Sequence, residues 1–242
     1  MKSLCRNGLR TFMSRKRTYR TFTYREAVFR ICCDRFDAVT AEIVRQRRIL
    51  EDYIGRHPDF RQSLEPLELL TGAPEVAQSM ARAAKLAGVG PMAAVAGAMA
   101  QCAGLAALDA GAREVIVDNG GDIYICAVVP VIIGLKTGTA ELADRLAFSL
   151  QPDESPISIC SSSGKMGHSM SLGECDLATV VAKDAALADA AATQAANLVR
   201  TVDDIDPALE NIAAIEGVDG VMIIKGARVG LAGKLPPLVR IK

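Results

Sequence analysis

The segment VDNGGDIYI, residues 117–125, places two adjacent glycines between two runs of apolar residues. Glycine readily adopts the positive φ angles of a two-residue hairpin turn, so the segment predicts two antiparallel strands that reverse at Gly120 and Gly121. Backbone without side chains also lets a ligand approach closely. Asn119 and Asp122, at the two edges of the turn, would be the polar side chains nearest to that ligand; Asp122 could instead cap the turn.

Outward from this turn, the expected strands occur in neighbouring pairs separated by helices. Residues 19–33 are typical of a hairpin or of one broken strand. Further strands are expected at residues 114–118, 123–129, 157–160, 178–182, 220–225 and 237–241, and residues 131–135 form a further apolar run. Helices are expected at 36–55, 75–86, 91–109, 141–148, 184–201 and 203–215. Because this order is not a strict βαβ alternation, it favours an α+β fold of mainly antiparallel sheets backed by helices. The order of Gly/Ser-rich loop, strand and Ala-rich helix recurs, as an internal duplication would produce.

The charge distribution separates a tail from a domain. The formal net charge is zero and half of the residues are hydrophobic, which is typical of a globular protein and argues against a nucleic-acid partner. Positive charge is concentrated before residue 31. We therefore expect a basic, flexible tail at residues 1–18 and a single domain at residues 19–242.

The composition predicts a cytoplasmic protein without a membrane span. Seven cysteines, an odd number, form no CxxC pair, which indicates a reducing compartment. The N-terminus lacks the apolar stretch of a secretion signal. Residues 86–108 carry no charge and could span a bilayer by length, but they are mostly Ala and Gly with Pro91 and Gln101 inside. We expect a buried helix there.

Two nucleotide-binding patterns fail on their context. GVGPMA, residues 88–93, matches GxGxxA, but it follows a helical pattern where a dinucleotide-binding loop must follow a strand. The pair Gly164–Lys165 would need a glycine at position 159 for a phosphate-binding P-loop, and that residue is Ile159.

The loop SSSGKMGHS, residues 161–169, offers hydroxyls, flexible backbone and a lysine. Ser162, Ser163 and Gly164 could hold a phosphate through hydroxyl and backbone donors, and a polar surface loop is the alternative. His168 lies in this loop and is the better placed of the two histidines for acid–base chemistry, because His57 precedes Pro58 in a charged segment.

The helix AKDAALADAAATQAANLV, residues 182–199, carries a second polar pair. Asp189 and Thr193 are four residues apart and therefore project from one helix face. A carboxylate and a hydroxyl are oxygen ligands suited to Mg²⁺. The alternative is a surface aspartate beside a threonine that bonds to its own helix.

Four of these segments, in this order, resemble the ApbE superfamily, whose best-known members are FAD:protein FMN transferases. The segments are GVGPMAAVAG (88–97), VDNGGDI (117–123), SSG (162–164) and ATVVAKDAALADAAAT (178–193). Within the superfamily the chain is most similar to a short cytoplasmic branch of uncharacterised ApbE-like proteins. The resemblance implies an α+β fold with a duplicated T-fold arrangement.

The resemblance also implies roles for individual residues. Asp189 and Thr193 would ligate Mg²⁺, and Asn119, Gly120, Gly121 and Asp122 would line a pocket for FAD or FMN. Ser162, Ser163 and Gly164 would bind phosphate. His168 and Asp189 would be catalytic. The implied partners are a flavin nucleotide and an acceptor protein, and a homo-oligomer is compatible with the Ala/Gly-rich surfaces.

Two departures from the superfamily pattern leave two functions open. Active transferases carry H-I-I-D-P where this chain reads HSMSLG, residues 168–173, so the aspartate and proline are absent. The lysine of the family's G-G-x-A-K-G segment is also absent near residues 92–94. One hypothesis is a Mg²⁺-dependent transferase that uses FAD or a similar nucleotide pyrophosphate. The alternative is a non-catalytic module that binds flavin or another heterocycle as a carrier, sensor or assembly factor.

Overall fold

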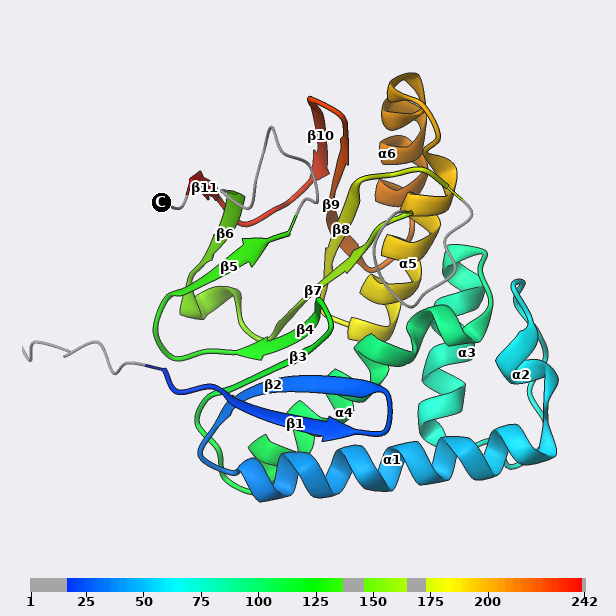
Figure 1. The fold of residues 1–242 in the computed structure, drawn as a ribbon, viewed down its shortest axis with the longest axis vertical. Helices are drawn as coiled ribbons and strands as arrows, with labels where there is room; N and C mark the ends of the chain where they lie inside the picture. Colours follow the sequence, from blue (N-terminus) through cyan, green and yellow to red (C-terminus); the bar gives the residue numbers. More distant parts are fainter. Residues whose placement is uncertain (1–16, 137–145, 165–172, 241–242) are drawn as a thin grey trace, which may run out of the picture.

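The computed structural model describes residues 17–136, 146–164 and 173–240, and it contains two antiparallel sheets (Figure 1). The larger sheet has eight strands in the order β1-β2-β3-β4-β7-β8-β9-β10. Its strands are β1 (Arg20–Tyr24), β2 (Ala27–Cys33), β3 (Val115–Asn119), β4 (Asp122–Cys126), β7 (Ile157–Ser162), β8 (Leu177–Ala182), β9 (Val218–Lys225) and β10 (Arg228–Gly233). The smaller sheet has the order β11-β6-β5, from β5 (Val131–Leu135), β6 (Leu146–Leu150) and β11 (Leu238–Arg240).

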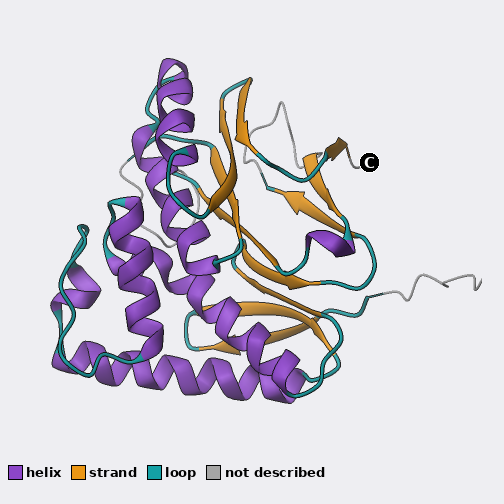
Figure 2. Ribbon diagram, turned by 180° about the vertical axis from the view of Figure 1, so that it is seen from behind, coloured by secondary structure: helices purple, strands orange, loops and turns teal. Residues whose placement is uncertain are grey.

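The helices cover one face of the large sheet and the small sheet lies on the other side, as Figure 2 shows from behind. The helices are α1 (Phe36–Arg56), α2 (Asp59–Gln62), α3 (Glu75–Ala87), α4 (Val95–Asp109), α5 (Ala185–Leu198) and α6 (Ile205–Ala213). Short 3₁₀ turns occur at Pro91–Ala94, Pro152–Glu154 and Val202–Asp204. The prediction of antiparallel sheets backed by helices is confirmed.

The large sheet is built from two halves with the same topology. In the first half, the hairpin β1–β2 is followed by helices α1 to α4 and then by the hairpin β3–β4, with β2 paired to β3. In the second half, the hairpin β7–β8 is followed by α5 and α6 and then by β9–β10, with β8 paired to β9. Pairing of β4 with β7 joins the halves. The expected duplicated arrangement is therefore present.

Each central strand contributes side chains to two hydrophobic cores, because successive side chains point to opposite faces of a sheet. On β3, Val115 and Val117 belong to the core beneath the helices, whereas Ile116 belongs to the core beneath the small sheet. On β4, Tyr124 faces the helices while Ile123 and Ile125 face the small sheet. Burial on both faces explains why these strands read as nearly continuous apolar runs.

Helix α4 is a core helix. Residues Pro91–Asp109 are long and apolar enough to cross a membrane by length and composition alone, and half of that stretch is buried within the protein. The helix contacts α1, α5, β3 and β4. An added Cβ at Gly104 would lie 2.2 Å from the ring of Tyr124. The absence of a side chain at Gly104 therefore lets α4 pack directly on Tyr124 of the sheet. The expectation of a buried helix is confirmed.

The structure differs from the sequence predictions at β6 and β10, and the short helix α2 was not predicted either. The helix predicted at residues 141–148 is wrong for residues 146–148, which lie in β6; residues 141–145 are outside the described part of the chain. Strand β6 pairs with β5 and β11 and buries Phe148 and Leu150, so its apolar run serves a sheet. Strand β10 had no sequence prediction, because two glycines in RVGLAG weaken the strand signal.

The beginning of the domain is held by one arginine. Arg17 donates to the carboxylate of Glu114 at 2.8 and 2.9 Å and to the carbonyls of Val129 and Pro130. Residues 1–16 of the predicted basic tail lie outside the described residues.

Candidate functional site

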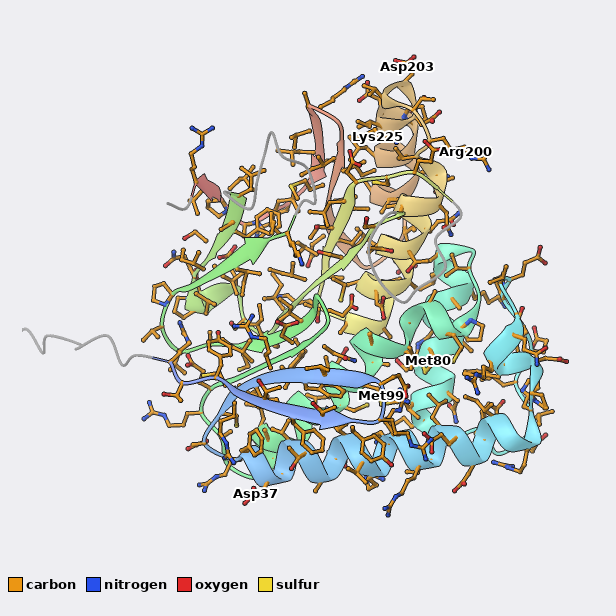
Figure 3. The ribbon with its side chains drawn as sticks, viewed as in Figure 1. Asp37, Met80, Met99, Arg200, Asp203 and Lys225 are labelled. Carbon is orange, nitrogen blue, oxygen red and sulfur yellow. The ribbon has the colours of Figure 1, made fainter. Side chains whose placement is uncertain are left out.

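A cavity of about 670 Å³ opens on the helix side of the large sheet, where the two halves meet. Its inner wall combines the turn between β3 and β4, the end of β7 and one face of α5. Its lining includes six residues predicted from sequence: Asn119, Gly120, Asp122, Ser162, Asp189 and Thr193. Figure 3 labels one of its apolar lining residues, Met99 of α4, beside the turn of the β1–β2 hairpin.

Two buried carboxyl groups, one from each half, line this cavity. Asp122 begins β4 on the same face as Tyr124, is 8% exposed, and its Oδ1 has no hydrogen-bond partner among the described residues. Asp189 of α5 is also 8% exposed, and its Oδ2 accepts a hydrogen bond from the backbone N–H of Gly97 at 2.9 Å. The interpretation of Asp189 as a surface residue is therefore wrong.

Burial raises the pKa values of both carboxyl groups. The pKa of Asp122 lies well above its usual range because the group is desolvated and because Asp189 adds a second negative charge nearby. Desolvation raises the pKa of Asp189 to about 7, although the backbone N–H groups of Gly97 and Ala96 favour its charged form. Because two buried like charges repel, the pair favours a bound proton or a cation.

Close packing of α4 on α5 holds Asp189 in place. An added Cβ at Gly97 would lie 2.1 Å from the carbonyl oxygen of Ala185 and 2.9 Å from Cβ of Asp189. Only a glycine allows this approach. The first turn of α4 then points its free N–H groups toward the carboxylate, as suits the positive end of a helix dipole.

The turn between β3 and β4 has glycines at both central positions because its backbone takes positive φ angles there. Gly120 has φ 71° and Gly121 has φ 111°, and Asn119 pairs with Asp122 across the turn. The carboxylate that caps the turn is Asp118, whose Oδ1 accepts from the N–H of Gly121 at 3.0 Å. An added Cβ at either glycine would meet nothing within 4 Å, so Gly120 leaves open space in the cavity wall.

Asn119 joins this turn to the start of α4. Its Nδ2 donates to the carbonyl oxygen of Ala96 at 3.2 Å, one residue before the N–H group that binds Asp189. The turn, α4 and α5 are thus linked through one short stretch of backbone.

The serines of the second predicted loop have different surroundings. Ser162 lies at the end of β7, is buried and lines the cavity, and its Oγ has no hydrogen-bond partner among residues 17–136, 146–164 and 173–240. Ser163 and Gly164 do not line the cavity, because Ser163 Oγ and the N–H of Gly164 both donate to the carbonyl of Cys175, at 3.4 and 2.9 Å. The surface-loop interpretation is wrong for the two buried serines. His168 lies outside the described residues.

The donors at the inner end of the cavity are oxygen atoms. The described part of the chain contains no group of three or more His, Cys, Asp or Glu side chains that could hold a metal ion. Asp122, Asp189, Thr193 and Ser162 together present two carboxyls and two hydroxyls. Among the described residues, Oδ1 of Asp122 and Oγ of Ser162 find no hydrogen-bond partner. This donor set fits Mg²⁺, which takes one or two carboxylates and completes its shell with water and phosphate oxygens.

Several polar lining residues were not predicted from sequence, among them Asn197 and two arginines. Asn197 follows Thr193 by four residues, so the helix periodicity that pairs Asp189 with Thr193 could have identified it. Arg47 and Arg61 also line the cavity. They come from α1 and from α2, far from the other site residues in the sequence, and nothing in their local pattern distinguishes them from surface arginines.

Comparisons with known proteins agree on one family. A protein-family model described as "AbpE bacteria" matches residues 29–231. A UPF0280 protein of Archaeoglobus fulgidus is 40% identical over 229 residues, which cover 90% of this chain and 92% of that protein.

Solved structures have the same fold at low identity. The flavin transferase ApbE from Vibrio cholerae superposes with a TM-score of 0.57 at 12% identity, covering 90% of this chain and 96% of that one. The ApbE protein of Thermotoga maritima gives a TM-score of 0.58 at 13% identity, covering 89% and 96%. At such low sequence identity, the structural similarity shows a shared fold and nothing about function. On the sequence match and this fold, the chain belongs to the AbpE bacteria family and, like the UPF0280 proteins, is a member of the ApbE-like superfamily.

Proposed function

We propose that this protein binds a flavin nucleotide at the cavity and, with a divalent cation, transfers the FMN part of FAD to a hydroxyl group of an acceptor protein. The observation that carries the proposal is the pair of buried carboxyls, Asp122 and Asp189, facing one cavity beside two hydroxyls. The structural relatives named as flavin transferases support the choice of ligand.

Each residue has a definite task in this proposal. Asp189 and Thr193 hold the cation from one face of α5, and Oδ1 of Asp122, which has no hydrogen-bond partner in the described part of the chain, completes the protein ligands. Ser162 Oγ donates to a phosphate oxygen. When bound, Mg²⁺ would neutralise the pyrophosphate and stabilise the departing phosphate.

The proposed reaction is a phosphoryl transfer from the AMP oxygen of FAD to the acceptor oxygen. The acceptor oxygen bonds to the FMN-side phosphorus while the bond from that phosphorus to the AMP oxygen breaks. The acceptor's proton goes to a base, for which His168 is the candidate because both carboxyls hold the cation, and AMP leaves as its phosphate anion. With water as the acceptor, the same step releases FMN and AMP.

The test is AMP release from FAD with and without Mg²⁺, in the presence of candidate acceptor proteins. We expect release that requires Mg²⁺ and that is lost in Asp189→Asn. The control is Asp184→Asn on the same helix: Asp184 caps α5 through the N–H of Leu187, does not line the cavity, and asparagine caps equally well. Release that is unchanged in Asp189→Asn would contradict the proposal.

A non-catalytic flavin-binding module is the second candidate, and the altered sequence at residues 168–173 favours it. It predicts that FAD or FMN raises the melting temperature while no AMP forms. If neither flavin binds at any Mg²⁺ concentration, both candidates are wrong.

A cytoplasmic location of the protein is part of the same proposal. The six cysteines of the described residues are all free, although Cys32 and Cys33 are adjacent. This supports a reducing compartment and hence a cytoplasmic protein.

A further inference from the structure

The outer end of the cavity has a different chemistry from the inner end. It is lined by the turn of the β1–β2 hairpin at residues 26–28, by Arg47 of α1 and by residues 61–64. All of these belong to the first half of the fold. Where the inner end presents carboxyls and hydroxyls, the outer end presents guanidinium groups and apolar side chains.

Both walls of the outer end are fixed. On the hairpin side, Arg25 pairs with Glu51 at 2.7 Å and Arg47 pairs with Glu26, so α1 holds the turn. Arg25 has φ 54°, which is unusual for a residue with a side chain, and the ion pairs of Arg25 itself and of Glu26 hold the turn that contains it.

On the opposite wall, a buried aromatic residue anchors residues 61–64. Phe60 is fully buried and packs edge-on against Tyr53, with ring centroids 5.2 Å apart. Three residues later, the carbonyl of Ser63 presses on Gly90, where an added Cβ would lie 1.9 Å from the oxygen. Arg61 and Leu64 therefore project from backbone that packs firmly on the domain.

Arg61 supplies a positive charge to the cavity wall. The residue is exposed, and its guanidinium makes no ion pair or hydrogen bond within the described ranges 17–136, 146–164 and 173–240. Arg47 is balanced by Glu26 and by Glu51 at 3.9 Å. Such a guanidinium in a concave wall, with a second one held in place in the lining of the same cavity, is suited to bind a phosphate or a carboxylate.

Apolar side chains flank these arginines without being buried. Val28 is 50% exposed and Leu64 is 54% exposed, and both line the cavity. Apolar groups that face a cavity while open to solvent gain free energy when a ligand covers them.

We propose that the outer end is a second binding subsite, which takes an acidic group carried on an apolar or aromatic part of the ligand. The guanidinium of Arg61 binds the acid, Arg47 adds to the positive field, and Val28 and Leu64 contact the apolar part. This inference goes beyond the proposed function. FAD has no acidic group besides its pyrophosphate, so the acid bound by Arg61 would belong to a second ligand at the outer end.

The test uses two fluorescent probes that differ in one acidic group, without divalent cations. 8-Anilinonaphthalene-1-sulfonate carries a sulfonate on an aromatic system, and N-phenyl-1-naphthylamine lacks it. We expect Arg61→Met to weaken binding of the sulfonate about 10- to 100-fold and to leave the neutral probe unchanged. The matched control is Arg48→Met, an exposed arginine of α1 that does not line the cavity.

Equal sulfonate affinity in Arg61→Met and Arg48→Met would overturn the proposal. Urea midpoints show whether each variant folds as the wild type does, and an exposed arginine without partners should leave the midpoint unchanged. Phenyl phosphate and benzoate, as competitors, identify the acid: displacement by the first supports a phosphate and by the second a carboxylate, while displacement by neither overturns the subsite.

The Asp189→Asn variant separates the two proposals. It should lose Mg²⁺-dependent FAD binding and keep sulfonate binding. If wild-type protein does not bind FAD but loses affinity for the sulfonate probe in Arg61→Met, the flavin proposal fails and the subsite stands. If FAD binds with Mg²⁺ but Arg61→Met leaves the affinity for the sulfonate probe unchanged, the subsite fails and the flavin proposal stands.

Discussion

The two halves of the fold share one topology but contribute different groups to the cavity. The first half supplies the turn with Asp122, the first turn of α4 and the arginines at the outer end. The second half supplies Asp189 and Thr193 from α5, together with Ser162. Neither half alone has two carboxyls at this place. The duplication thus creates a polar site at the junction of the two halves.

The helices of the two halves also differ in how they are buried. Helix α1 is amphipathic, with Val39, Ile43 and Leu50 buried and charged residues outside. Helix α5 is buried almost all round by alanines, and Asp189 and Thr193 are buried with them. Polar groups in such surroundings cost free energy unless they find partners, so their presence indicates a ligand more strongly than charges on α1 could.

The largest effect on stability should come from a side chain placed between α4 and α5, where the two halves pack together. Replacement of Gly97 by valine would drive a side chain into the carbonyl of Ala185, and we expect a loss of at least about 3 kcal/mol in the free energy of unfolding. Urea denaturation measures it. As a control, Gly55→Ala in α1 adds a Cβ with no neighbour within 4 Å and should stabilise by about 0.5–1 kcal/mol. If both variants behave alike, contact between α4 and α5 is not what holds the halves together.

The second effect compares the two carboxyls directly. We expect Asp122→Asn and Asp189→Asn each to weaken Mg²⁺-dependent FAD binding about 100-fold, or about 2.7 kcal/mol, because each removes one charge from a shared cation. Titration calorimetry should give a double variant little worse than either single one. Additive losses would mean that the carboxyls act at separate places.

The third effect is a pH dependence of stability without a cation. Because burial raises the pKa of Asp189 to about 7 from about 3.9 in an unfolded chain, its stabilising contribution is complete below about pH 4 and is lost as the pH rises toward 7. We expect wild-type protein to lose on the order of 2 kcal/mol over this range relative to Asp189→Asn. Added Mg²⁺ should restore it at pH 7. Parallel pH curves for the two proteins would contradict the burial of a charge at Asp189.

The smallest effect concerns the turn of the first half. Gly120→Ala places a side chain at φ 71° and should destabilise by about 1 kcal/mol, whereas Gly120→Asn should cost less because asparagine tolerates this region. Thermal unfolding distinguishes them. Equal losses would show that backbone conformation is not the reason for glycine here.

Local patterns predicted most of the fold and the inner end of the site. The hairpin at Gly120 and Gly121 follows from turn chemistry, and the spacing of Asp189 and Thr193 follows from helix geometry. The small sheet was harder to predict, because the run at β6 satisfies helix and strand patterns alike. Cap and ligand roles could not be separated either: Asp118 caps the turn while Asp122 faces the cavity.

The outer end could not be predicted, because it depends on contacts between distant segments. Arg47 and Arg61 line the cavity only because α1 packs on α4 and α2 packs against the 3₁₀ turn at Pro91–Ala94, and no local pattern predicts these contacts. The partner of Asp189 is likewise a backbone N–H group ninety-two positions away, at Gly97.

The most direct test is a crystal structure of the protein with Mn²⁺ in place of Mg²⁺ and with FAD, measured at a wavelength where Mn²⁺ scatters anomalously. We expect one anomalous peak at the junction of the halves, bonded to oxygens of Asp189 and Thr193 at about 2.0–2.2 Å and close to Asp122, with the pyrophosphate of FAD against it. A cavity without metal or flavin, or a peak remote from Asp122 and Asp189, would contradict the account.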